Sequence, residues 1–464
     1  MKIHFKGAAQ TVTGSQLLIE TNGNKILLEC GLFQGRRQDY YERNAHFSFN
    51  PREIDALLLS HAHIDHSGNL PNLVKNGYSK PIYATPATVS LADIMLRDSG
   101  HIQEADVKFV NKKRARRGEP PLKPLYTIED AERVNDRFIK IPYDHPFSPC
   151  KGITAQFIDA GHILGSAAIM LDIEEDGKKT RLWFSGDIGR EQLPLLKDPI
   201  FPLHPDYMIM ECTYGDKPHR SPEAAFVEFR EVVQKTVKRG GKVIIPAFAV
   251  GRTQELIYLL NEMIANRDIP AIPVFIDSPL AIQATDVFQD YADEFDEETR
   301  AFVKSKKHPA LQFPTLKFTS SVKESKAINK VKGPCIIISA SGMAETGRIL
   351  HHLRNNIENP KNTIMIVSWQ APYTLGRRLA EREEVVRIFG QLFERRAEIA
   401  TIGGLSAHAG QEMLIKYAQA AGPQLKRLFL VHGEAAASNA LQEKLKGKIK
   451  APVLFPEQFD FVEI

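Results

Sequence analysis

Three histidines and an aspartate lie within six residues of this sequence, directly after an apolar run that predicts a β-strand. The segment is His61-Ala62-His63-Ile64-Asp65-His66, and the run before it is Ile54–Leu59. Residues two apart in an extended chain point to the same side, so His61 and His63 can bind one metal ion. If a helix begins next, Asp65 and His66 turn toward a second ion. Imidazole with carboxylate is a zinc-type ligand set.

The plainer alternative is a polar loop whose histidines cap the following helix. At ordinary residue frequencies, this density of ligand types is expected by chance in about one chain in a thousand. Further donors follow later predicted strands: His162 in a glycine-flanked loop before Ala167–Ile173, and Asp187 in Ser185-Gly186-Asp187 after Arg181–Phe184. Each alone is typical of a turn or a helix cap, but together with the first cluster they predict one metal site.

The composition places the chain among ordinary folded proteins. It has 464 residues, of which 43% are hydrophobic and 25% charged, which excludes disordered and collagen-like classes. With 60 basic and 56 acidic residues, the net charge of +4 predicts no global polycation, so nucleic-acid binding requires a local patch. The four cysteines are scattered singly and predict reduced thiols. No apolar run resembles a signal peptide or a membrane span, so we expect a cytoplasmic protein without membrane contact.

The strand and helix pattern predicts two domains, one inserted into the other. Short β-type runs come first, including a hairpin around the Asn22-Gly23 turn, with helices expected at Pro86–Asp98 and Ile128–Arg137. From about residue 222 helices and strands alternate regularly, which is typical of a parallel, doubly wound sheet. Residues 397–464 return to short strands. No proline- or glycine-rich linker separates these blocks, so we expect an insertion.

The ligand motifs resemble the metallo-β-lactamase superfamily, and further motifs resemble its β-CASP branch. That branch contains the cleavage-and-polyadenylation endonuclease and its bacterial and archaeal relatives. Segments 246–252, 339–343 and 370–377 are also typical of the branch, so the resemblance spans essentially the whole chain. The three branch motifs are Glu211-Cys212-Thr213-Tyr214-Gly215, Ser406-Ala407-His408-Ala409 and Val431-His432-Gly433-Glu434.

The resemblance implies an α/β fold, namely a metallo-β-lactamase αββα sandwich interrupted by a β-CASP domain with a doubly wound parallel sheet. We expect the first part of the metallo-β-lactamase domain at residues 1–212, the β-CASP domain at 213–396 and the C-terminal part of the first domain at 397–464. The resemblance also implies two Zn²⁺ ions. The first would be bound by His61, His63 and His162 and the second by Asp65, His66 and His432, with Asp187 bridging both.

The resemblance implies hydrolysis of a phosphodiester by a hydroxide that the metals activate and that Asp65 helps to orient. His408 is the expected general acid for the leaving ribose 3′-oxygen, and Glu211 would hold its imidazole and favour the protonated form. The structural alternative for this pair is a buried salt bridge at the domain boundary. Glu29 departs from the family pattern, which usually has Asp here. We expect Glu29 to orient the loop that carries the ligands without contacting the metal, and we expect the protein to remain active.

Small residues and arginines after the predicted strands of the inserted domain are candidates for binding substrate phosphates, because backbone N–H groups at the start of a helix attract anions. Each is equally an ordinary strand-to-helix turn residue. The basic run Lys112–Arg117 either follows an RNA backbone or is a solvated loop, and Trp183 and Trp369 are expected in the core. The phosphate-binding candidates are Ser341, Gly342, Arg348, Arg252 and Arg377, together with Ser406 two residues before His408.

The function these features favour is a zinc-dependent endoribonuclease that acts on single-stranded RNA and leaves a 5′-phosphate and a 3′-hydroxyl. The first alternative is a 5′-to-3′ exoribonuclease of the RNase J type. Such relatives usually carry a further C-terminal domain, whereas 32 residues follow His432. The second alternative is a hydrolase of small esters or thioesters, which the inserted domain disfavours. The third is a non-catalytic RNA-binding paralogue, which would be expected to lack ligands.

DNA is not an expected substrate, because DNA-acting relatives resemble the pattern except for Val at the position of His432. Whether the protein forms a homodimer is left open by the sequence.

Overall fold

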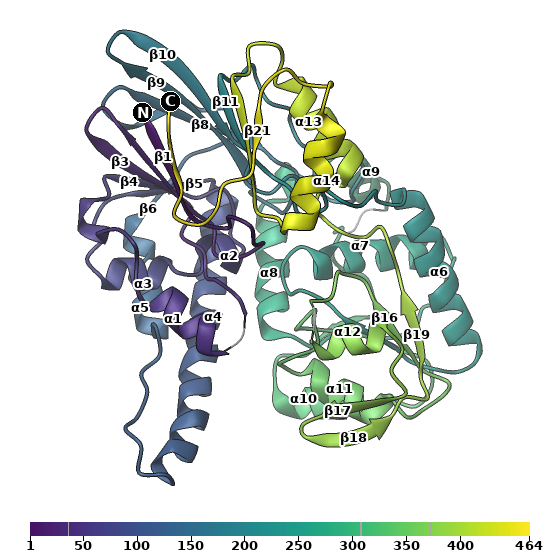
Figure 1. Cartoon of the computed structure of the whole chain (residues 1–464). Coiled ribbons are helices and arrows are strands. Elements are labelled where there is room, and N and C mark those ends of the chain that lie inside the picture. The colour runs from purple at the N-terminus through teal and green to yellow at the C-terminus, as the bar shows by residue number, and fades with distance from the viewer. Residues whose placement is uncertain (36, 307–308, 372) are drawn as a thin grey trace. The chain divides into compact units, whose positions relative to one another are not determined.

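The computed structural model describes residues 1–35, 37–306, 309–371 and 373–464, and they form two compact units (Figure 1). Among the described helices, none is long and apolar enough to cross a membrane. The first unit is discontinuous in the sequence, because the chain leaves it and later returns. It comprises Met1–Glu191, Asp198–Pro218 and His408–Ile464, and the second unit comprises Gln192–Lys197 and His219–Ala407.

The first unit contains two seven-stranded sheets. The first sheet has the order β22 (Phe461–Glu463), β1 (Lys2–Gly7), β2 (Gln16–Thr21), β3 (Asn24–Leu28), β4 (Ala56–Leu58), β5 (Ile82–Ala84), β6 (Phe138–Lys140). The second has the order β21 (Val453–Leu454), β20 (Arg427–Val431), β11 (Tyr207–Glu211), β10 (Lys178–Phe184), β9 (Ala167–Glu175), β8 (Ile153–Asp159), β7 (Phe147–Cys150). The β2–β3 hairpin turns at Asn22-Gly23, as predicted.

Alternating side chains of these strands build two hydrophobic layers, because successive residues of a strand point to opposite faces. Leu182 and Phe184 of β10 join Ile26 of β3 in the core between the sheets. Trp183, on the opposite face, is fully buried against helices α13 (Gln411–Ala420) and α14 (Ala435–Leu445). Its indole N–H donates to the Tyr417 hydroxyl at 3.0 Å. Helices therefore cover sheets that pack on each other, which confirms the predicted αββα sandwich.

One helix of this unit differs clearly from the sequence prediction. Helix α4 runs over Pro86–Ala115, 30 residues, well past the predicted end at Asp98. Its buried residues stop at Gly100, so the second half has no face packed on the core, and its large apolar side chains Ile102 and Phe109 are exposed. The other helices here are α1 (Arg37–Ala45), α2 (Ile64–Ser67), α3 (Leu70–Lys75) and α5 (Ile128–Glu132), with 3₁₀ turns at Pro51–Glu53 and Asn135–Arg137.

The second unit is built on a six-stranded sheet in which every neighbouring pair is parallel, as predicted for a doubly wound domain. Its order is β14 (Leu316–Phe318), β13 (Val274–Ile276), β15 (Ile336–Ser339), β12 (Val243–Pro246), β16 (Thr363–Ile366), β19 (Glu398–Thr401). The helices are α6 (Pro222–Lys238), α7 (Arg252–Ala265), α8 (Pro279–Asp290), α9 (Glu297–Lys306), α10 (Val322–Ile328), α11 (Ile349–Asn356) and α12 (Leu375–Ala380), with a 3₁₀ turn at Ala292–Glu294. A separate hairpin joins β17 (Val385–Ile388) to β18 (Gln391–Glu394).

Two features of this unit differ from the sequence prediction. Strand β19, expected in the C-terminal part of the host domain, pairs in parallel with β16, so the chain returns to the first unit only at His408. A short strand carries no local mark of the sheet it joins, because its partners lie far away in the sequence. Trp369, expected in the core, follows β16 and is 39% exposed.

Candidate metal centre

The histidine cluster lies where β4 gives way to α2. His61 and His63 occupy the loop after β4, with His63 at the N-cap of α2, and Asp65 and His66 lie within the helix. The backbone holds this turn in place, because Ser15 N–H donates to the Asp65 carbonyl and Cys30 N–H to the His66 carbonyl, both at 2.8 Å. The loop after the strand thus carries two of the predicted ligands, and the helix carries the other two.

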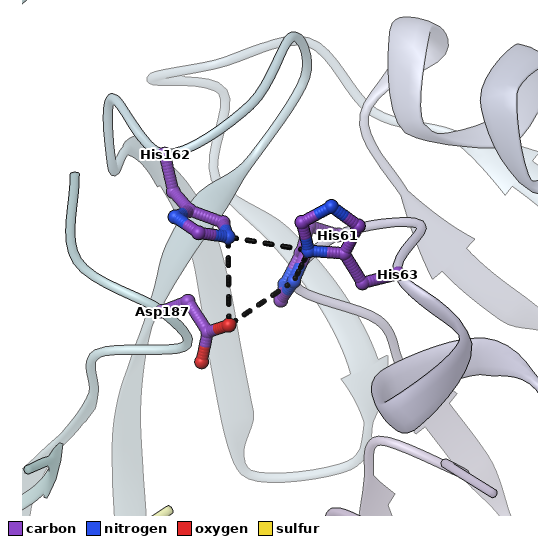
Figure 2. Close-up of side chains that lie close together, drawn as sticks. All are labelled: His61, His63, His162 and Asp187. Atoms are coloured by element: carbon purple, nitrogen blue, oxygen red, sulfur yellow. Dashed lines mark hydrogen bonds and ion pairs between the residues drawn. The ribbon is translucent and has the colours of Figure 1, made fainter. Parts of the chain in front are cut away.

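Two distant loops bring His162 and Asp187 to the same place (Figure 2). His63 Nδ1 lies 3.1 Å from His61 Nε2 and 3.2 Å from His162 Nε2. Asp187 Oδ2 lies 3.4 Å from His61 Nε2 and 3.5 Å from His162 Nε2. Asp187 is placed by a turn that needs glycine: Gly186 has φ +55°, and a Cβ there would lie 2.8 Å from the side chain of Ser60.

The spacing of these four donors fits a tetrahedral zinc site. Zinc–nitrogen bonds of about 2.0–2.1 Å in a tetrahedron separate the ligand atoms by about 3.3 Å. The separations from His63 and Asp187 are 3.1–3.5 Å, close to that value. Burial lowers the pKa of His61 to about 3 and that of His63 to about 4, so both imidazoles are neutral at pH 7 with lone pairs available. The donor set therefore fits a metal ion.

A second group of donors adjoins the first and shares Asp187 with it. His66 Nε2 lies 3.2 Å from His432 Nε2, which is 3.5 Å from Asp65 Oδ2. Asp187 Oδ1 faces this group, 3.3 Å from His66 Nε2, and it is buried without a hydrogen-bond donor. A buried acceptor without a hydrogen bond destabilises the folded state unless a cation interacts with it. The two oxygens of Asp187 thus face two different groups of predicted ligands.

Glu29, the residue that departs from the family pattern, lies fully buried behind the second group. Its Oε2 accepts from His66 Nδ1 at 2.6 Å and from Ser60 Oγ at 3.0 Å, and Oε1 accepts from Ser60 N–H at 2.6 Å. Burial raises the pKa of the Glu29 carboxyl, and these hydrogen bonds oppose that rise. A proton held on Nδ1 leaves Nε2 of His66 with its lone pair toward the other ligands. The longer side chain therefore still reaches the ligand histidine.

Glu29→Gln is expected to weaken metal binding about 10–100-fold, the usual effect of losing a group that orients a metal ligand. A glutamine offers one acceptor oxygen, whereas His66 and Ser60 together present three donors. Competition with a fluorescent zinc chelator measures the change. Glu53→Gln, an exposed carboxylate paired with Lys25, is the matched control and should bind metal as the wild type does. Equal affinity in both variants would contradict the role of Glu29.

A carboxylate–imidazole pair lies beside the two ligand groups. Glu211 ends β11 and is fully buried, and its Oε1 lies 3.1 Å from His408 Nδ1. Backbone N–H groups of Ile188 and Thr213 donate to the same carboxylate at 2.8 and 3.2 Å. Burial alone would lower the pKa of His408, but Glu211 and Asp187 outweigh it and raise the pKa to about 9. His408 is thus a partly exposed imidazolium next to the ligands, with its ring 4.5 Å from that of His162.

Sequence comparison matches three families in order along the chain. They are the "Metallo-beta-lactamase superfamily domain" at residues 18–178, the "Beta-Casp domain" at 253–379 and the "Zn-dependent metallo-hydrolase RNA specificity domain" at 393–456. Ribonuclease TTHA0252 of Thermus thermophilus is 36% identical over 445 residues, 96% of each chain. This chain belongs to the β-CASP family of the metallo-β-lactamase superfamily.

Other relatives of this β-CASP protein come from Methanocaldococcus jannaschii. An "RNase J-like protein" is 30% identical and covers 98% of this chain and 97% of its own length. "Transcription termination factor FttA" is 29% identical over all of this chain and 72% of its own length. The fold is shared with a protein of unknown function from Enterococcus faecalis V583, with a TM-score of 0.54 over 99% of each chain and 11% identity.

The β-CASP unit holds most of the residues predicted to bind substrate. Ser341 and Gly342 follow β15, and the Ser341 hydroxyl accepts from the backbone N–H groups of Glu345 and Thr346. Arg348 donates to the Asp277 carboxylate and to two backbone carbonyls, and Arg252 forms a buried ion pair with Glu255.

 Both guanidinium groups are therefore committed to carboxylates of the protein. Arg377 is more exposed and pairs with Glu381 at 2.6 Å.

Ser406 precedes His408 by two residues and is half-buried. The predicted candidates therefore do not form one cluster of unpaired cations.

Two polar residues that the sequence did not single out also contact the ligands. The Ser60 hydroxyl lies 2.9 Å from His61 Nδ1 and donates a hydrogen bond to the Glu29 carboxylate. Thr213 Oγ1 lies 3.1 Å from Nδ1 of His432 and donates to the carbonyl of the same residue. Each contacts Nδ1 of its histidine, while Nε2 of the same ring faces other donors of the centre. Their only sequence signal is position, since each adjoins a ligand or carboxylate motif.

Proposed function

We propose that this protein is a zinc-dependent endoribonuclease that cuts single-stranded RNA and leaves a 5′-phosphate and a 3′-hydroxyl. The observation that carries the proposal is the pair of adjoining ligand groups around Asp187 with the Glu211–His408 pair beside them. Hydrolysis of a phosphodiester needs an activated water and a proton for the leaving oxygen, and this arrangement has groups for both.

RNA is the substrate class that the comparisons favour. A relative that matches this chain over 96% of each length is named a ribonuclease, and another is named RNase J-like. The domain described by its RNA specificity matches residues 393–456, which include Ser406, His408 and His432. These names support RNA over the small esters and thioesters that other members of the superfamily hydrolyse.

Each residue of the centre has a role in the proposed reaction. Zinc ions bound there would supply Lewis acidity, which lowers the pKa of water and polarises a phosphoryl oxygen. His408 donates the proton that the leaving 3′-oxygen needs, and Glu211 keeps its ring oriented through Nδ1. Asp65 is 22% exposed against 2% for Asp187, so it is the carboxylate that can orient the attacking water. The proposed ligands are His61, His63 and His162 for one ion, Asp65, His66 and His432 for the other, and Asp187 for both.

Incubation with single-stranded RNA labelled at either end tests this function, with DNA of the same sequence in parallel. We expect internal cuts in the RNA, the same sites from both labels and no cleavage of the DNA. The downstream fragments should accept a new 5′-label only after phosphatase treatment, because each carries a 5′-phosphate.

Other product patterns would select the alternatives. Mononucleotides released stepwise from the 5′ end would replace the endonuclease with an exonuclease of the RNase J type. Hydrolysis of small thioesters by protein that leaves every RNA intact would contradict the choice of substrate class.

A further inference from the structure

The second half of α4 and the segment that follows it protrude from the first unit. All of residues 101–124 are described, and none of them is buried, whereas the first half of α4 is buried on one side from Ala87 to Gly100. Figure 1 shows α4 extending well beyond the shorter helices of that unit. A protrusion without buried residues gains little from the hydrophobic effect, so stability of the core does not account for it.

Polar contacts nevertheless connect the end of the helix to the chain that follows it. The Asn111 side chain donates to the Leu122 carbonyl at 3.0 Å and accepts from Leu122 N–H at 2.8 Å. Arg114 Nε donates to the Pro120 carbonyl at 2.7 Å, and its guanidinium pairs with Glu119 at 3.0 Å. These contacts join the returning chain to the end of the helix.

The charge of the whole chain is concentrated on this tip, defined here as residues 108–123. It has seven basic residues and one acidic residue, Glu119, a net charge of +6. The whole chain carries +4, so all other residues together carry −2. The basic residues are Lys108, Lys112, Lys113, Arg114, Arg116, Arg117 and Lys123.

Helix stabilisation explains only part of this charge. Lys112, Lys113 and Arg114 lie in the last turn of α4, where cations interact favourably with the helix dipole. Arg116, Arg117 and Lys123 lie beyond the last helical residue, Ala115, and the Arg117 side chain is 73% exposed. The tip therefore presents more positive charge than the helix end needs.

The tip is linked to the candidate metal centre by the helix itself. The hydroxyls of Thr85 and Thr88, at the start of α4, donate to the Gly165 carbonyl at 2.6 and 2.7 Å. Gly165 belongs to the loop that carries His162. A 30-residue helix is about 45 Å long, so the tip lies about that far from the loop within the same unit.

We propose that the α4 tip binds the phosphate backbone of RNA at a distance from the metal centre, so that a long substrate is held at two places. The inference rests on the proposed function and adds a second contact to it. A polyanion complements a cluster of exposed cations with few neighbouring carboxylates, and such contacts are independent of sequence. A stacked strand advances about 3.4 Å per nucleotide, so a stacked RNA reaches the tip about 13 nucleotides past the centre.

The test compares a tip variant, K112A/K113A/R116A/R117A, with the control K444A/K446A/K448A/K450A, which removes the same charge from exposed lysines at and after the end of α14. Two RNAs that share one cleavage sequence serve as substrates. The RNA of about 6 nucleotides is too short to extend from the metal centre to the tip, and the RNA of about 40 nucleotides is long enough. For the long RNA, the tip variant should raise KM about tenfold at unchanged kcat. The slope of log Kd against the logarithm of the salt concentration should decrease by up to about 3. The short RNA and the control should behave as with the wild type.

Three results would overturn the inference: an unchanged KM for the long RNA, an equal loss in the control, or an equal loss with the short RNA. Thermal unfolding should coincide for all proteins, since the replaced side chains are exposed and alanine favours helix. If the wild type cleaves no RNA, the proposed function fails instead, and binding of the 40-nucleotide RNA by fluorescence anisotropy still tests the tip. If the tip variant bound this RNA as tightly as the wild type does, RNA binding by the tip would be contradicted, and an acidic protein surface would be the alternative partner.

Discussion

Asp187→Ala is expected to remove both metal ions and to lower RNA cleavage by more than about 10³-fold. Asp187 Oδ2 faces His61 and His162, and Oδ1 faces His66, so one substitution takes a donor from each ligand group. Losing a single stabilising group from an active site already lowers the rate about 10²–10³-fold. Metal content from atomic emission spectrometry and gel analysis of labelled RNA measure the two effects.

Asp172→Ala is the matched control for this variant. Asp172 lies in the same unit, is 43% exposed and pairs with Arg181 at 2.6 Å, a type of contact worth at most about 1 kcal/mol. Its metal content and cleavage should equal those of the wild type. Chelation should inactivate the wild type reversibly, with zinc restoring cleavage, whereas zinc should not restore Asp187→Ala. Two ions retained in Asp187→Ala would show that this carboxylate is not the shared ligand.

His408→Ala is expected to keep both metal ions and to lower kcat for RNA about 10²–10⁴-fold, the usual contribution of a general acid. His408 contacts the ligand groups only at their edge, with Nδ1 4.0 Å from Asp187 Oδ2, whereas it lies 3.1 Å from Glu211. Its loss therefore removes the proton donor and spares the ligands. His145→Ala, an exposed histidine of the same unit, should leave both properties unchanged.

The leaving group separates a proton donor from a structural salt bridge. A 3′-alkoxide needs a proton on departure, but p-nitrophenolate does not. The activity of His408→Ala on bis(p-nitrophenyl) phosphate should therefore stay close to that of the wild type while RNA cleavage is lost. An equal loss on both substrates would assign the Glu211–His408 pair a structural role.

Local sequence signals predicted much of the fold. The Asn22-Gly23 turn predicted the β2–β3 hairpin, and the apolar face of Pro222–Lys238 predicted α6 at the observed bounds. Both depend on interactions between residues close in the chain, which a sequence shows directly. The second half of α4 was missed because it has no buried face, and β19 was placed with the wrong sheet because its partner strand lies elsewhere.

The histidine cluster at 61–66 could be recognised for the same reason, since all its members lie within six residues after one strand. The sequence could not show that Arg348 and Arg252, both expected to meet a phosphate, instead pair with Asp277 and Glu255. A carboxylate neutralises a guanidinium only where packing brings the two together.

The sequence alone therefore indicated the family pattern, the side chains predicted to bind metal and the local elements that carry them. Only the folded chain showed that the two oxygens of Asp187 face different ligand groups, and that Glu211 reaches His408 across 197 positions of sequence. It also showed that the basic run near residue 114 lies at the end of a helix about 45 Å long. These properties depend on distances between segments remote in the chain, which arise from the packing of the sheets and helices and not from the order of residues within any one of them.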